Sequence, residues 1–305
     1  MSISGLPKKV TIWEAGPRDG LQNEPGTVPT AVKVELIERL VDAGVSHLET
    51  TSFVSPKWVP QMADNAEVMA RIRRRPGIHY QVLVPNMKGF EAAMAAGAEE
   101  IGIFTAASES FCKRNTNCSI DESLERLRPV CEAALARGVK VRAFVSCIAG
   151  CPFEGEIAPE KVAAVTAALA AMGAYEVALG DTIGVGTPGK VRTAVEACAA
   201  QVPLEKLAVH CHDTYGQALA NILAALEVGV ASIDSSVGGL GGCPYAPGAT
   251  GNVATDDVVY MLDGLGVETG IDLEKLVQTS WFISDALGRP PASNVARAMK
   301  AKCAA

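Results

Sequence analysis

The feature that most limits the fold of this 305-residue chain is one pattern repeated along nearly its whole length: a short β-rich run, polar residues, an Ala- and Leu-rich helical stretch, a glycine, and then the next β-rich run. The β-rich runs lie at residues 10–14, 48–51, 80–84, 100–104, 139–145, 175–179, 207–210 and 232–235. Strands that alternate with helices pair in parallel through crossover connections, so the pattern predicts an α/β protein with a parallel sheet.

The helical stretches lie between the β-rich runs, for example at residues 31–43, 86–96, 119–137, 159–172 and 218–228. A glycine separates a helical stretch from the next β-rich run at positions 44, 97, 138, 173 and 229. The C-terminus of a helix favours a residue with positive φ, which glycine adopts without strain. These positions therefore mark where the helices end.

Polar residues follow nearly every β-rich run. This favours eight loops that meet on one face of a (β/α)8 (TIM) barrel over a doubly wound open sheet, in which ligands gather around a single crevice. We expect one catalytic domain over residues 1–305, with the barrel at about 8–270 and a C-terminal helical extension at about 271–305 that begins with a helix at 272–287.

The charge and the first residues limit the possible partners. A net charge of −7 argues against a general nucleic-acid surface, which needs a basic stripe. The first nine residues lack the apolar core of a signal peptide, and no apolar run has the length of a membrane span. Together with nine cysteines, this predicts a cytoplasmic protein with reduced thiols and with no membrane partner.

Two histidines, His210 and His212, end the seventh β-rich run. Residues i and i+2 of a strand share a face, so both imidazoles point into the barrel mouth, where they either bind one divalent cation or form hydrogen bonds in the core. Asp19, in the segment 16–22, offers a carboxylate oxygen, and Asn252 offers an amide oxygen after the eighth run. Two nitrogens and two oxygens, completed by water or substrate oxygens, favour six-coordinate Mg²⁺ or Mn²⁺ over tetrahedral Zn²⁺.

Charged residues follow other β-rich runs as well. Arg18 presents a planar cation that suits a carboxylate or thioester oxygen, or it forms an ordinary surface pair with Asp19. Glu49 and Asp181 are candidates for proton transfer or for orienting Arg18. All four are therefore candidate catalytic residues.

Three uncharged polar residues near the same strand ends are candidates for binding substrate: Gln22, Ser52 and Thr182. The two hydroxyl groups can hold a substrate carboxylate, and they can equally cap the helices that follow. The segment from Gly238 to Gly248 is rich in glycine. Glycine loses much conformational entropy when it is ordered, so such a segment is typical of a mobile lid. Cys243 lies within this segment and is a candidate catalytic thiol.

Together these motifs resemble the hydroxymethylglutaryl-CoA lyase family. Arg-Asp-Gly-x-Gln with His-x-His is shared by a wider group of condensing enzymes and aldolases, whereas Ser-Phe-Val-Ser-Pro-Lys-Trp and the glycine-rich cysteine segment are more specific to the lyases. The resemblance runs from about residue 10 to 270. It departs from the family pattern at Asp256, where Glu is common, and at Gly238, where Ala is common.

The resemblance implies a metal-dependent (β/α)8 barrel, usually a homodimer, that cleaves 3-hydroxy-3-methylglutaryl-CoA to acetyl-CoA and acetoacetate, as in leucine and ketone-body catabolism. It places the cation at Asp19, His210, His212 and Asn252. In this retro-Claisen reaction the metal polarises the 3-hydroxyl and a base removes its proton. The base is either Asp19 or a water on the metal.

The resemblance also implies roles for two further groups and leaves rival functions open. Arg18 would stabilise the developing acetyl-CoA enolate, and either His210 or Cys243, which would lie in an active-site lid, would serve the later protonation. The first rival is the same cleavage of a longer-branched 3-hydroxyglutaryl-CoA. An isopropylmalate-type synthase usually carries a C-terminal regulatory domain, and about 35 residues follow Gly270 here. The last rival is a non-catalytic acyl-CoA-binding barrel, which would normally have lost metal ligands.

Overall fold

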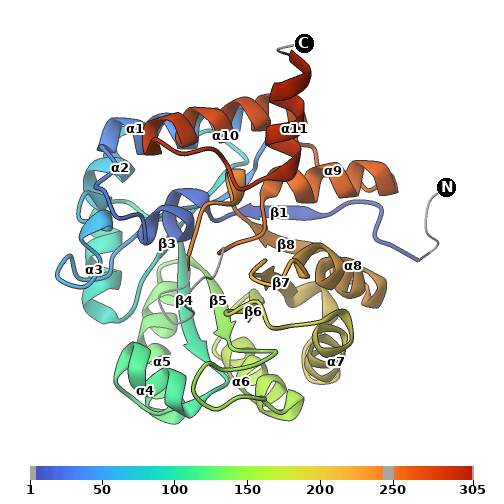
Figure 1. The fold of residues 1–305 in the computed structure, drawn as a ribbon. Helices are drawn as coiled ribbons and strands as arrows, with labels where there is room; N and C mark the ends of the chain where they lie inside the picture. Colours follow the sequence, from blue (N-terminus) through green and yellow to red (C-terminus); the bar gives the residue numbers. More distant parts are fainter. Residues whose placement is uncertain (1–4, 243–250, 304–305) are drawn as a thin grey trace.

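The computed structural model describes residues 5–242 and 251–303, and Figure 1 shows the arrangement of their helices and strands. Eight parallel strands pair in sequence order, and β8 pairs back to β1, which closes the barrel. The strands are β1 Thr11–Glu14, β2 His47–Ser52, β3 His79–Leu83, β4 Glu100–Ala106, β5 Lys140–Ser146, β6 Glu176–Asp181, β7 Leu207–Cys211 and β8 Ser232–Ser235. The predicted (β/α)8 barrel is confirmed, and each predicted run matches a strand with small shifts at its ends.

Helices surround the barrel, and further helices follow it (Figure 1). They are α1 Thr30–Asp42, α2 Asn65–Arg71, α3 Met87–Ala95, α4 Glu109–Thr116, α5 Ile120–Ala136, α6 Pro159–Ala171, α7 Pro188–Ala199, α8 Ala218–Val228, α9 Thr255–Leu265, α10 Leu273–Leu287 and α11 Asn294–Cys303. The predicted C-terminal helix corresponds to α10, which contacts α1 and α9. Helix α11, which also contacts α9, was not predicted separately from the C-terminal extension.

The five glycines predicted to end helices all have positive φ, from 71° at Gly138 to 112° at Gly229. At Gly44 the requirement is also one of space, because a Cβ atom there would meet the carbonyl oxygen of Gly270. The glycine therefore allows the end of α1 to approach the segment that leads into α10.

The interior of the barrel carries charge. Arg142 of β5 is fully buried, and its guanidinium lies 2.6 Å from Asp234 of β8 and 2.6 Å from Glu176 of β6. The same guanidinium lies 4.4 Å from the ring centre of Trp13 of β1. Contacts among four different strands are possible only across the interior of the barrel. Removing one partner of such a buried pair typically lowers the free energy of unfolding by about 3–5 kcal/mol, because it leaves a buried charge without a partner.

A cluster of titratable side chains lies where β2, β3 and β4 begin, at the end of the barrel opposite the strand carboxyl ends. The rings of His47 and His79 stack with their centres 4.1 Å apart and their planes 7° apart. His79 Nδ1 lies 2.7 Å from Glu100 Oε2, and the hydroxyl of Tyr175 donates a hydrogen bond to the same carboxylate. Burial, together with the charge of His79, lowers the pKa of His47 to about 4. The folded protein therefore favours the neutral form of His47.

We predict that His47→Gln reduces the loss of stability on acidification. In the unfolded chain His47 takes up a proton near its ordinary pKa of 6.5, whereas in the folded chain it does so only near pH 4. The unfolded state binds more protons between these values, so the free energy of unfolding falls as the pH falls through this window. Urea denaturation at pH 8 and at pH 5 should show a larger decrease for the wild type than for the variant. Equal decreases in the two proteins would contradict the burial of His47 as the cause.

Candidate active site

A cavity of about 240 Å³ opens at the carboxyl ends of the strands, the end of a (β/α)8 barrel where catalytic groups are found. One part of its wall is apolar and comes mainly from β3, β4 and β5; it includes Leu83, Phe104, Phe144 and Val145. The polar part of its wall includes Arg18, Asp19, Gln22, Thr182, His210 and His212. Six of the residues predicted from the sequence thus lie on one cavity.

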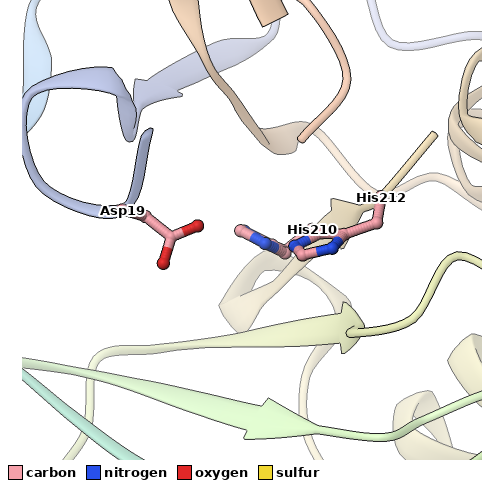
Figure 2. Close-up of side chains that lie close together, drawn as sticks. All are labelled: Asp19, His210 and His212. Carbon is pink, nitrogen blue, oxygen red and sulfur yellow. The ribbon is translucent and has the colours of Figure 1, made fainter. Parts of the chain in front are cut away.

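Three of these side chains converge as a metal site would require. Figure 2 shows the carboxylate of Asp19, which follows β1, facing the imidazoles of His210 and His212. One potential ligand atom of each lies within 4.8 Å of those of the other two. The two imidazole ring centres are 5.2 Å apart.

Asn252 is the fourth predicted ligand, and it lies beside the other three. The backbone of Asn252 forms a β-bridge with that of His212. The side-chain Nδ2 of Asn252 donates hydrogen bonds to Asp19 Oδ2 at 2.8 Å and to the carbonyl oxygen of Leu240 at 3.3 Å. The buried Oδ1 of Asn252 and the buried Nδ1 of His212 have no hydrogen-bond partner within the described part of the chain. Buried polar atoms without a partner are costly, so this donor set fits a bound divalent cation.

The charges around Asp19 and His212 match the needs of metal ligands. Burial alone would raise the pKa of Asp19, but the charges of Arg18, His210 and His212 lower this pKa to about 2. Burial, with the neighbouring charge of His210, lowers the pKa of His212 to about 4. At neutral pH Asp19 is therefore an anion and His212 is neutral, which are the forms that bind metal. The pKa of His210 is raised: burial alone would lower it, but the hydrogen bond and charge of Asp234 outweigh that effect.

Arg18 is held by two carboxylates within a short π-helical turn, Gly16–Gly20. Its Nε donates to Glu49 Oε2 at 2.6 Å, and its Nη1 donates to Asp19 Oδ1 at 2.6 Å. A second contact joins Nη2 to the same Glu49 oxygen. Glu49 is buried behind Arg18 and is not among the residues that line the cavity. Its position thus suits the orientation of Arg18 better than proton transfer, the other role that the sequence allows for Glu49.

The turn that carries Arg18 is itself fixed by a residue that sequence reasoning missed. Glu14 Oε1 accepts hydrogen bonds from the backbone N–H of Gly16 at 2.7 Å and of Val237 at 2.8 Å, and its Oε2 accepts from Thr255 Oγ1 at 2.6 Å. Glu14 thus joins the loop after β1 to the loop after β8. A glutamate as the last residue of a predicted strand is the only sequence signal for it, because two of its partners, Val237 and Thr255, are distant along the chain.

The remaining predicted residues divide between the cavity and the protein around it. Gln22 and Thr182 line the cavity, whereas Ser52 and Asp181 do not. Asp181 Oδ2 accepts a hydrogen bond from the backbone N–H of Gly186 at 2.9 Å, and the Ser52 hydroxyl accepts one from a nearby backbone N–H. Burial raises the pKa of Asp181 to about 6. These contacts stabilise the loops after β6 and β2.

The chain is similar to known proteins over most of its length. The HMGL-like family model matches residues 9–283. A curated relative from Bos taurus, named hydroxymethylglutaryl-CoA lyase, mitochondrial, is 60% identical over 297 residues, which cover 97% of this chain and 91% of the relative. The crystal structure of hydroxymethylglutaryl-CoA lyase from Pseudomonas aeruginosa has a TM-score of 0.96 and 56% identity, covering 98% of this chain and 99% of that one. An HMG-CoA lyase from Acinetobacter baumannii, in complex with coenzyme A and 3-methylmalate, has a TM-score of 0.92 and 37% identity, covering 98% and 97%.

These relatives correct one expectation and leave another outside the structure. The prediction of a cytoplasmic protein is wrong, because the relatives from Bos taurus and Homo sapiens are named as mitochondrial proteins. That prediction rested on the first residues of the sequence, which do not decide the compartment. Cys243 lies outside the described residues. Within them, no helix has the length and hydropathy to cross a membrane.

We predict that His212→Ala removes high-affinity binding of Mn²⁺ while the protein remains folded. The variant deletes one of the converging nitrogens, and no other described side chain stands in the same place. Calorimetric titration of metal-free protein should show no tight site, and circular dichroism should show unchanged helix content. His79→Ala, at the opposite end of the barrel, is the matched control and should bind Mn²⁺ like the wild type. Unchanged affinity in His212→Ala would remove His212 from the ligand set.

Proposed function

This chain belongs to the HMGL-like family, and we propose that it is a lyase that cleaves 3-hydroxy-3-methylglutaryl-CoA to acetyl-CoA and acetoacetate. The observation that carries the proposal is that the Arg18 guanidinium and the Asp19–His210–His212 cluster face one cavity. The reaction needs these two kinds of group together, a cation where negative charge develops and ligands for a metal beside the hydroxyl that loses its proton.

The cleavage moves one proton and one electron pair. The C3 hydroxyl loses its proton, the C2–C3 bond breaks, and C3 becomes the ketone carbon of acetoacetate. The electron pair of the broken bond passes into the thioester as the enolate of acetyl-CoA, and a proton then returns to C2. A divalent cation, when bound, supplies positive charge that makes the C3 hydroxyl easier to deprotonate.

Arg18 is suited to the enolate because its position is fixed before the reaction. Glu49 and Asp19 hold its guanidinium from two sides, so little reorganisation is needed when negative charge appears on the thioester oxygen. Asp19, with a pKa of about 2, is a weak base. Its carboxylate therefore serves as an anionic ligand better than as the group that removes the hydroxyl proton.

The substrate is held by the rest of the cavity wall. We assign the terminal carboxylate of the substrate to the polar side chains of Gln22 and Thr182, and the methyl branch to the apolar wall at Leu83 and Phe144. The Acinetobacter baumannii lyase, solved with coenzyme A and a branched hydroxy dicarboxylate, supports an acyl-CoA ligand of this class. The names of the relatives do not favour a longer-branched substrate, a condensing synthase or a non-catalytic barrel.

Two further assignments rest on chemistry and family resemblance. We infer Mg²⁺ or Mn²⁺ as the cation, because a carboxylate, an amide oxygen and two imidazoles leave room for oxygen ligands of water or substrate. We also infer a homodimer and a single catalytic domain, as the family resemblance implies.

The proposed activity is tested by incubating the purified protein with 3-hydroxy-3-methylglutaryl-CoA and Mg²⁺ and measuring both products. We expect acetyl-CoA and acetoacetate in equal amounts. Removal of the metal with a chelator should abolish turnover, and added Mg²⁺ should restore it. Failure to form acetoacetate in the presence of either Mg²⁺ or Mn²⁺ would refute the proposed function.

We predict that Arg18→Gln lowers kcat by about 10²–10³-fold and changes KM little, because the guanidinium acts on charge that exists only in the transition state. Arg18→Lys keeps the charge but not the planar pair of donors to Glu49, so its kcat should fall between those of the wild type and the glutamine variant. Thermal denaturation of both variants controls for the buried Glu49 carboxylate that loses its partner. An effect confined to KM would make Arg18 an anchor for the substrate instead.

A further inference from the structure

Asp234 lies directly behind His210, one of the proposed metal ligands. Residues His210 of β7 and Asp234 of β8 are paired in register, so their side chains are neighbours on the inner face of the barrel. Asp234 Oδ2 lies 3.3 Å from His210 Nδ1. Asp234 is 1% exposed, so solvent does not replace this contact.

The contact determines which imidazole nitrogen of His210 is available to a cation. A carboxylate only accepts hydrogen bonds, so the nitrogen that faces Asp234 carries the proton. Nδ1 of His210 is therefore the donor, and Nε2 keeps a lone pair that can point to Asp19 and His212. His212 differs, because its buried Nδ1 has no hydrogen-bond partner among the residues that the structure describes.

Asp234 is held in place from its other side. Arg142 Nη2 donates to Asp234 Oδ1 at 2.6 Å, and Arg142 Nη1 lies 3.3 Å from Oδ2. Arg142 in turn donates through Nε to Glu176 Oε1 at 2.6 Å. With both carboxylate oxygens engaged, Asp234 cannot rotate away from His210 without breaking a buried ion pair.

We propose that Asp234 is a positioning residue that holds His210 with Nδ1 protonated and Nε2 free to bind the divalent cation. The inference rests on the proposed function, because it takes His210 as a ligand. Carboxylates that accept a hydrogen bond from a metal-binding histidine fix its tautomer and ring orientation, and their loss typically weakens metal binding by about 10–100-fold. An amide in place of the carboxylate also stabilises the wrong tautomer.

The first test compares Asp234→Asn with Glu176→Gln. Each variant removes one carboxylate beside Arg142, but only Asp234 touches His210. Calorimetric titration of the metal-free proteins with Mn²⁺ should show affinity at least about tenfold weaker for Asp234→Asn and close to wild type for Glu176→Gln. Equal affinities in the two variants would overturn the inference and leave the proposed function standing. A wild-type protein that binds no Mn²⁺ would overturn the proposed metal site, and this inference with it.

The second test needs no folded variant at position 234. The chain has four histidines, so their ring nitrogens can be resolved by two-bond ¹H–¹⁵N correlation of the labelled wild-type protein, with His210 assigned by its absence in His210→Gln. In the neutral form of its imidazole, we expect His210 to carry its proton on Nδ1. A proton on Nε2 would overturn the assignment of Asp234 whatever the variants do.

Discussion

The structure depends on how one buried cation, Arg142, is neutralised inside the barrel. Its guanidinium lies between Asp234 and Glu176 and against the ring of Trp13, so residues of β1, β5, β6 and β8 must meet at one place. No aliphatic packing elsewhere could compensate for a guanidinium left without its carboxylates. The arrangement that closes the barrel therefore also gives this buried charge its partners.

The same electrostatic chain reaches the active site. From Glu176 it passes through Arg142 and Asp234 to His210, and a second chain runs from Glu49 through Arg18 to Asp19. In both, a fully buried carboxylate or guanidinium fixes a group that faces the cavity. Glu49 and Asp234, which would touch neither substrate nor metal, thus orient Arg18 and His210 from buried positions.

Local periodicity accounts for what the sequence could predict. The strands follow from β-rich runs, and the shared direction of His210 and His212 follows from their spacing of two. The same alternation explains why one predicted site residue, Asp181, does not line the cavity. Thr182 lines it, whereas Asp181, one residue earlier, points to the opposite side. The pairing of Arg142 with Asp234 was beyond reach, because 92 positions separate them and only the closed barrel makes them neighbours.

The cavity is divided between two arcs of the barrel. The proposed metal ligands come from β7 and from the loops after β7, β8 and β1, which adjoin one another because the sheet is closed, while the apolar wall comes mainly from β3, β4 and β5. On the proposed function, the groups assigned to bond-breaking and the apolar groups assigned to the methyl branch therefore lie on separate strands. Such a division lets evolution, or an engineer, alter the acyl group that is accepted by changing one arc while the reactive arc stays intact.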